Sequence, residues 1–228
     1  MEQTETVVAS NGKLTQKVTI EQITIPAPNF QRLAFTVQGT APLVMHKFSQ
    51  KVQNEMKEKQ EAGPTAAKGK KRKPKDFEEQ YENAKHLSTD GWPGIPATAF
   101  RNAMISACKI VGFHMTKGKI SVFVEQDGFS EDGVPLIEFT KGEPHYHETA
   151  VRLATGVADI RARPMWDPGW EAAVRVRFDA DIFTASDVTN LLMRAGLQVG
   201  ILEGRPDSKK STGQGWGTFD IVGSPEAV

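Results

Sequence analysis

"GWPGIPATAFRNAMISACKIVG", residues 91–112, predicts the principal helix of the chain. Its apolar side chains recur at the spacing of one helix face, in the order Phe100, Ala103, Met104, Ala107, Cys108 and Val111. Thr98 is placed to cap the start of this helix, and Gly112 is placed to end it. The stretch therefore predicts a helix that buries one face against a core.

The segments around this helix carry strand patterns. Within 30–39, Leu33, Phe35 and Val37 alternate with Arg32, Ala34 and Thr36, which predicts a strand with one buried face. Further strands are expected over 14–25, 197–202 and 216–222, a strand–turn–strand over 119–139, and a hairpin over 157–178 that turns at "DPG". Shorter helices are expected within 41–49, over 76–87 after Asp76, and over 184–196 between a Thr184–Asp187 capping box and Gly196. This order predicts an α+β fold with helices against a mostly antiparallel sheet.

The composition restricts the class of protein. The 228 residues include 28 Lys and Arg and 28 Asp and Glu, so a polyanion has to be held by local charge. Cys108 is the single cysteine, which excludes an internal disulfide and a zinc site built from cysteines. We find no signal peptide and no apolar run of membrane-spanning length, and therefore expect a cytoplasmic protein without membrane contacts.

The chain divides into three parts by composition. We expect a polar segment and strand over 1–29, one domain over 30–222 and a tail over 223–228. The domain carries an insertion over about 40–95. Within it, residues 61–75 are basic and poor in apolar side chains, which predicts a flexible loop. Its cations Lys70, Lys71, Arg72 and Lys73 form either a solubilising insertion or an arm that binds nucleic acid.

"GRPDSKKSTGQGWGTFDI", residues 204–221, has the composition of a phosphate-binding loop. A P-loop needs a Gly-Lys pair that leads into a helix, whereas a strand pattern follows here. Two interpretations remain, a plain connection between strands or a loop that lies along a sugar-phosphate backbone. The second assigns binding to Lys209, Lys210, Gly213 and Gly215.

Four arginines alternate along the predicted hairpin 157–178. Arg161 and Arg163 lie on one face of its first strand, and Arg175 and Arg177 on one face of its second. If the two strands pair, all four share a face near Trp166 and Trp170, a pattern that suits single-stranded nucleic acid. The alternative is a solvated outer face of the sheet.

The sequence holds few candidates for catalysis. His46 follows the first long strand, where a general acid or base is able to serve RNA cleavage, but it stands alone. The histidines His114, His145 and His147 lack acidic ligands at suitable spacing, so we predict no metal site. We also predict no cofactor.

Residues 94–109, "GIPATAFRNAMISACK", and the glycine-rich residues 204–221 together resemble the repeat-associated mysterious protein (RAMP) superfamily, the ferredoxin-like subunits of CRISPR effector complexes. The family's "IPGSSLKGALR" pattern is matched by Ile95, Pro96, Thr98, Phe100 and Arg101, and its glycine-rich loop by Gly213, Gly215 and Gly217. The sequence departs from this pattern at Ala97, where the family usually has glycine, and at Asn102, where glycine or alanine is common. "RARPMWDPGW" also resembles phage-encoded relatives of this fold.

The resemblance implies a ferredoxin-like, RRM-like antiparallel sheet with helices on one face and a long insertion after the first core strand. It also implies single-stranded nucleic acid in a groove, bound partly by Arg101, and side-by-side oligomers that form a filament, in the host cytoplasm if the protein is phage-encoded.

Three functions follow from the sequence. The first is a non-catalytic protein that binds single-stranded RNA or DNA and oligomerises along it. The second is a phage structural or assembly protein whose charges are simply solvated. The third is a metal-independent endoribonuclease that uses His46. Composition and motifs rank them in this order.

Overall fold

The computed structural model describes residues 24–47, 57, 61, 75–152, 158–208 and 214–228. Its core strands are β1 (Phe30–Gly39), β4 (Val122–Glu125), β9 (Glu171–Asp179) and β10 (Phe219–Ala227). They lie in the antiparallel order β10-β1-β9-β4. Two helices connect them, α3 (Ala97–Ile110) between β1 and β4, and α5 (Ala185–Arg194) between β9 and β10. This is the ferredoxin-like arrangement that the sequence predicted.

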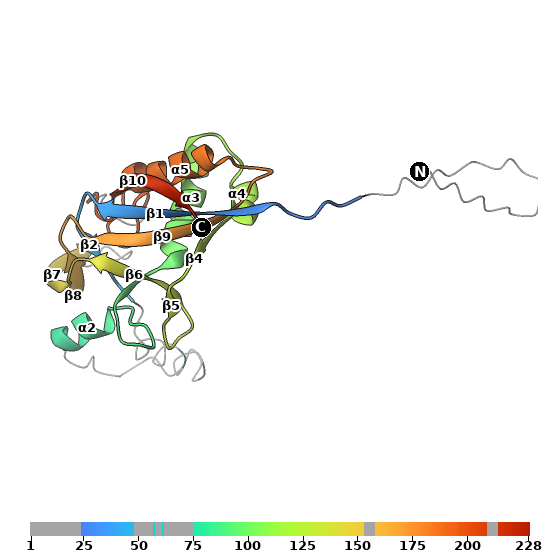
Figure 1. The fold of residues 1–228 in the computed structure, drawn as a ribbon. Coiled ribbons are helices and arrows are strands. Elements are labelled where there is room, and N and C mark those ends of the chain that lie inside the picture. The colour runs from blue at the N-terminus through green and yellow to red at the C-terminus, as the bar shows by residue number, and fades with distance from the viewer. Residues whose placement is uncertain (1–23, 48–56, 58–60, 62–74, 153–157, 209–213) are drawn as a thin grey trace, which may run out of the picture.

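Both connecting helices lie on one side of the main sheet, as Figure 1 shows above β1 and β9. Leu33, Phe35 and Val37 of β1 are buried beneath them, which confirms the predicted inner face. Phe100 of α3 is fully buried and its ring lies edge-on to Phe219 of β10, with 5.3 Å between centroids. The periodicity of α3 and the alternation of β1 thus meet in one core.

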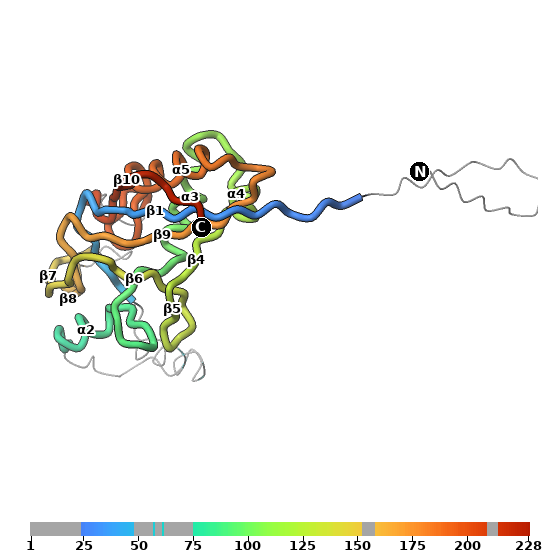
Figure 2. Tube along the Cα trace, viewed as in Figure 1, coloured from blue at the N-terminus to red at the C-terminus, as the bar shows by residue number. Residues whose placement is uncertain are grey.

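Two insertions interrupt this core. Between β1 and α3 the described residues form β2 (Leu43–Val44), α2 (Phe77–Asn83) and β3 (Gly94–Pro96). Between α3 and β9 the chain adds, besides β4, the elements α4 (Met115–Ser121), β5 (Gly128–Phe129), β6 (Pro135–Lys141), β7 (His145–Arg152) and β8 (Ala158–Trp166). β6 pairs with β9 and β3, whereas β8 lies between β2 and β7 in a separate three-stranded sheet. The small sheet and α2 lie at one end of the molecule, away from α4 (Figure 2).

The hairpin predicted over 157–178 is wrong. β8 and β9 exist and a tight turn joins them, but they enter different sheets and do not pair with each other. The fully buried indoles of Trp166 and Trp170 lie on either side of this turn, where both contact Phe139 of β6. Burial of these large rings competes with hairpin pairing, and it separates the two strands.

The predicted helix ends are partly correct. Asp76 caps α2, and Thr184 and Asp187 form the capping box of α5 as expected. Thr98, in contrast, lies inside α3, because Pro96 occupies the N-cap position. Gly196 does not end α5, since the chain continues as the π-helix η1 (Ala195–Val199) up to Gly200.

Several strand and helix predictions also need correction. Residues 197–202 form part of η1 and a turn in place of a strand, and residues 41–47 form β2 without a helix. The segment 119–139 begins within helix α4, so its strand starts only at Val122. The strand expected over 14–25 and most of the basic loop 61–75 lie outside the described residues.

Candidate nucleic-acid interface

An open cavity of about 370 Å³ lies between α3 and the turn Gly200–Arg205. We call it the α3 cavity. From α3 it is lined by Thr98, Asn102 and Ser106, which follow one another at i, i+4 and i+8. His86 also lines it. This polar stripe runs beside the apolar stripe that packs on the sheet, so the helix supplies hydroxyl and amide groups to the cavity.

The start of α3 adds backbone donors to this cavity. Pro96 stands at the N-cap, and its side chain makes no capping hydrogen bond to the first turn of the helix. The first N–H groups of an α-helix have no intrahelical partner, and they attract anions. Thr98 and Ala99 of this turn line the cavity. The site is therefore suited to a negatively charged oxygen.

The opposite wall is the turn Gly200–Arg205, where the glycine-rich segment begins. Arg205 lines the cavity and donates from Nη1 to the carbonyl oxygen of Leu202 at 3.0 Å. Gly217 packs against this turn so closely that a Cβ there would lie 1.9 Å from the carbonyl oxygen of Ile201, and its φ is +70°. Gly217 is thus required by the packing of the turn. The glycine-rich segment connects η1 to β10, so it does not join two strands as expected.

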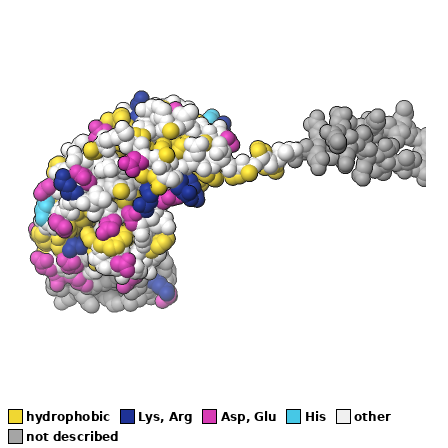
Figure 3. All heavy atoms as spheres, in the orientation of Figure 1, with side chains coloured by type: hydrophobic (Ala, Val, Ile, Leu, Met, Phe, Trp, Pro, Cys, Tyr) yellow, Lys and Arg dark blue, Asp and Glu magenta, His cyan; other side chains and the backbone are white. Residues whose placement is uncertain are grey.

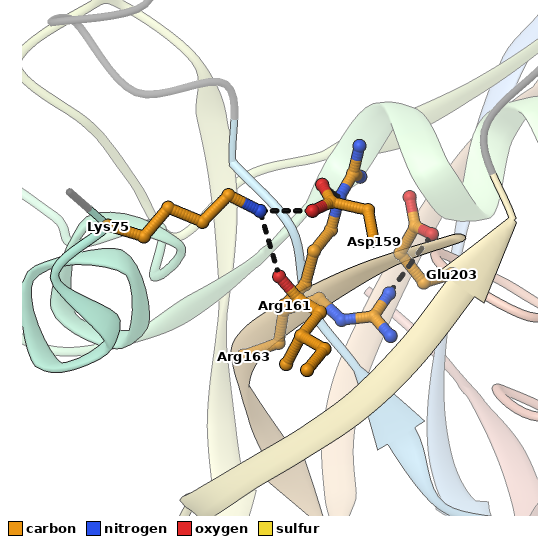
Figure 4. Close-up of polar contacts among 6 residues, drawn as sticks. Lys75, Asp159, Arg161, Arg163 and Glu203 are labelled. Atoms are coloured by element: carbon orange, nitrogen blue, oxygen red, sulfur yellow. Dashed lines mark hydrogen bonds and ion pairs between the residues drawn. The ribbon is translucent and has the colours of Figure 1, made fainter. Parts of the chain in front are cut away.

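A second group of charged side chains adjoins the cavity. It comprises Arg161, Arg163, His46 and Glu203, and we call it the β8 cluster. Nη1 of Arg163 lies 3.4 Å from Oε2 of Glu203, and Nε of Arg161 lies 3.8 Å from Oδ2 of Asp159 (Figure 4). Glu203 directly follows Leu202 of the cavity wall. The turn Gly200–Arg205 therefore contributes residues to both the cavity and the cluster.

Lys75 ties the end of the basic segment to this cluster. Its Nζ makes an ion pair with Asp159 and donates to the carbonyl oxygen of Ile160 at 3.2 Å (Figure 4). The hydrogen bond from Lys75 lowers the pKa of Asp159. Lys75 itself is therefore attached to the first residues of β8.

The histidines of this region are neutral at neutral pH. Burial lowers the pKa of His46, and nearby Arg161 lowers it further. Burial and Lys47 lower the pKa of His86 to about 4. Burial and Arg163 lower the pKa of His147, which lies opposite Arg163 in the β7–β8 pair and 5.8 Å from the ring of Trp216. The positive charge at this surface comes from arginine and lysine.

The other two predicted arginines lie on the outer face of the main sheet. Arg175 makes an ion pair with Asp127 at 2.5 Å. The guanidinium of Arg177 lies beside the contacting rings of Phe30 and Phe123, at 5.2 and 5.1 Å from their centroids. They belong to a different sheet from Arg161 and Arg163, so the four do not share one hairpin face. Basic and acidic side chains are interspersed over the molecular face of Figure 3.

Arg101 lies away from the α3 cavity. Its guanidinium donates to the carbonyl oxygen of Val122 at 3.0 Å and to that of Lys119, which joins α3 to the start of β4. Gly215 has a φ of +74° and nothing within 4 Å of a Cβ position. Lys70, Lys71, Arg72, Lys73, Lys209, Lys210 and Gly213 lie outside the described residues.

Sequence reasoning missed the polar stripe of α3 and the turn residues Glu203 and Arg205. The i, i+4, i+8 spacing of Thr98, Asn102 and Ser106 was a readable signal, because it runs parallel to the apolar stripe of the same helix. No sequence signal placed Glu203 next to Arg163, since this contact depends on the path of the chain after α5.

Within the described ranges, no three His, Cys, Asp or Glu residues are grouped so that they would hold a metal ion. Among the helices of this part of the chain, none is long and apolar enough to span a membrane.

The sequence matches no protein-family model and no curated protein. Its fold is similar to that of a chain in the cryo-EM structure of the type III-B Cmr-beta bound to cognate target RNA, with a TM-score of 0.50 and 8% sequence identity. The match covers 88% of this chain and 61% of that chain, so this protein spans less than two thirds of its neighbour's length. At this identity the likeness concerns the fold alone. It agrees with the predicted α+β, ferredoxin-like fold.

Proposed function

We propose that this protein binds single-stranded RNA, without cleaving it, along the surface formed by the α3 cavity and the β8 cluster. The observation that carries the proposal is that residues of the first motif and Arg205, near the start of the second, line one open cavity. Backbone N–H groups, hydroxyls and Arg205 line this cavity, and they are the groups that bind phosphate and sugar oxygens. The fold supports the proposal, because a chain of similar fold belongs to a structure bound to target RNA.

The contacts indicate binding with little sequence choice. Arg161, Arg163 and Arg205 suit phosphates, which carry no sequence information. Trp216 packs over Gly204 beside the β8 cluster, since a Cβ at Gly204 would lie 2.6 Å from its indole ring. A partly exposed indole at this place offers a stacking surface to any base. We propose further that copies lie side by side along the RNA and that the complex is cytoplasmic.

Fluorescence anisotropy with a labelled 20-nucleotide oligouridine tests this function. We expect binding that weakens as salt is raised, and Asn102→Asp to weaken it about tenfold, because a carboxylate in the α3 cavity repels phosphate. Arg194→Gln, on the exposed side of α5, is the matched control, because it changes the net charge by the same one unit as Asn102→Asp but away from the α3 cavity. Binding that ignores both salt and Asn102→Asp would contradict the proposal.

The same samples discriminate the other two functions. RNA that stays intact in the presence of EDTA agrees with a non-cleaving protein, whereas cleavage lost on His46→Ala would favour the endoribonuclease. A defined oligomer that ignores RNA in size-exclusion chromatography with light scattering would favour the structural or assembly protein. A phage origin stays a prediction of the sequence.

A further inference from the structure

Arg163 is buried but poorly satisfied by the folded chain. Only 2% of the residue is exposed, and its Nη1 reaches Glu203 at 3.4 Å, near the upper limit for a hydrogen bond. Within the part of the chain that the structure describes, its Nε is buried without a hydrogen-bond partner. A guanidinium has five N–H donors, and a buried one normally has most of them engaged. Arg163 therefore retains donor capacity at its place in the protein.

Glu203, in contrast, is held loosely. Its side chain is 43% exposed, and its carboxylate makes only the long contact to Arg163 among the described residues. It lies on a turn whose preceding residue, Leu202, has a φ of +58°. A left-handed backbone is strained at a residue other than glycine, because its Cβ approaches the following carbonyl oxygen. The fold thus accepts strain at the point where it presents a carboxylate to Arg163.

The surroundings of Glu203 are cationic. Arg161 and Arg163 both lower the pKa of His46, whereas Glu203 raises it. Asp159, the other carboxylate of this region, is engaged by Lys75 and Arg161 (Figure 4). Glu203 is consequently the anion that faces Arg163.

We infer that Glu203 occupies the place of an RNA phosphate at Arg163 and that bound RNA displaces it. Carboxylate and phosphate oxygens accept the same hydrogen bonds from a guanidinium, so one is able to replace the other. This inference rests on the proposed function and specifies how its site is regulated. A single phosphate gains little binding free energy at Arg163, because it has to displace the carboxylate of Glu203. A strand that also binds in the α3 cavity adds the contacts needed to displace the carboxylate.

The substitution Glu203→Gln tests the inference, because it keeps the shape of the side chain and removes its charge. We expect this variant to bind the labelled oligouridine about tenfold more tightly than the wild type. We also expect log Kd to depend more steeply on log salt by about 0.7, as for one additional phosphate contact on a single strand. Glu226→Gln on the edge strand β10 is the matched control for net charge and is expected to bind like the wild type.

A double-mutant cycle separates displacement from a structural role of Glu203. In an Arg163→Gln background, Glu203→Gln should bring no gain in RNA affinity, because the cation for which Glu203 and the phosphate compete has been removed. Glu203→Asp keeps the charge but moves it away from Arg163, so this variant should bind RNA two- to threefold more tightly than the wild type. It replaces Glu203→Gln in the test if that variant does not fold.

The outcomes distinguish this inference from the proposed function. Wild-type binding with equal or weaker binding by Glu203→Gln would overturn the inference alone. Absence of binding by wild type and Glu203→Gln alike would overturn both.

Discussion

β8 and β9 follow each other in the chain and carry the same pattern, two arginines spaced by one residue, yet they differ in almost every contact. On β9, Arg175 is paired with Asp127 at 2.5 Å, and Arg177 makes cation–π contacts with two phenylalanine rings. On β8, Arg163 is buried against one loosely held carboxylate beside the α3 cavity. Among the described residues both Arg163 and Arg177 bury an Nε without a hydrogen-bond partner, but only Arg163 faces a half-exposed carboxylate that we propose RNA displaces.

The difference arises from the two sheets. The seven-stranded sheet that contains β9 packs on α3 and α5 and holds the apolar core. The three-stranded sheet that contains β8 includes the buried polar groups of Arg163 and His147. One sheet supplies most of the stability, and the other carries the chemistry of the proposed interface.

The largest effect is expected from Phe100→Ala in the core of the main sheet. Phe100 is fully buried against Phe219, so its loss should reduce the free energy of unfolding by about 3 to 5 kcal/mol in urea denaturation. Tyr146→Ala on the small sheet, where the residue is 39% exposed, should cost less than about 2 kcal/mol. Equal losses of unfolding free energy in the two variants would contradict the assignment of most of the stability to the main sheet.

Acid should destabilise the small-sheet side of the molecule first. The pKa of His86 is about 4 in the folded protein, whereas the ordinary pKa of histidine in the unfolded chain is 6.5. The folded protein therefore binds this proton only at a lower pH than the unfolded chain does. Its contribution is complete above about pH 6.5 and is lost as the pH falls toward 4, by at most about 3 kcal/mol. His86→Gln should reduce this pH dependence in thermal melts. If the melting temperature of His86→Gln fell as steeply as that of the wild type between pH 6.5 and 4, the prediction would be contradicted.

RNA affinity should separate the two arginine pairs directly. Arg161→Gln with Arg163→Gln is expected to weaken binding of the labelled oligouridine about 30-fold, which corresponds to about 2 kcal/mol. Arg175→Gln with Arg177→Gln has the same change of charge and should alter the affinity less than about threefold. Equal losses in anisotropy titrations would show that the outer face of the main sheet also binds RNA.

The smallest effect is expected for Arg175→Gln alone. The Arg175 and Asp127 side chains are 33% and 22% exposed, and partly exposed ion pairs contribute less than about 1 kcal/mol. The melting temperature should therefore change by only a few degrees. A larger change would show that Arg175 anchors the loop at Gln126, whose carbonyl oxygen accepts a hydrogen bond from it at 3.0 Å.

Local patterns predicted the core elements well. The alternation of Leu33, Phe35 and Val37 and the apolar stripe of α3 each depend on residues close in sequence, and both occur as expected except at Val111, which follows the helix and is 48% exposed. The capping box of Thr184 and Asp187 is equally local. The fold class followed from these elements together with the RAMP resemblance.

The candidate site was predicted less well, for a physical reason. Arg161 and Arg163 were expected at an interface with Arg175 and Arg177, because a tight turn normally joins paired strands. Burial of Trp166 and Trp170 on either side of that turn separates the strands instead. His86, Asn102 and Arg205 come together only when α3 and the turn after η1 pack against each other.

The sequence by itself determined the main helices, the inner face of β1 and the order of the core elements, since hydrophobic period and capping act over a few residues. The tertiary structure alone decided that β8 leaves the sheet of β9, and that Glu203 meets Arg163 beside the α3 cavity. Strand pairing and the contacts of a turn depend on residues far apart in the chain, because the free energy of burying a whole core selects among the local alternatives.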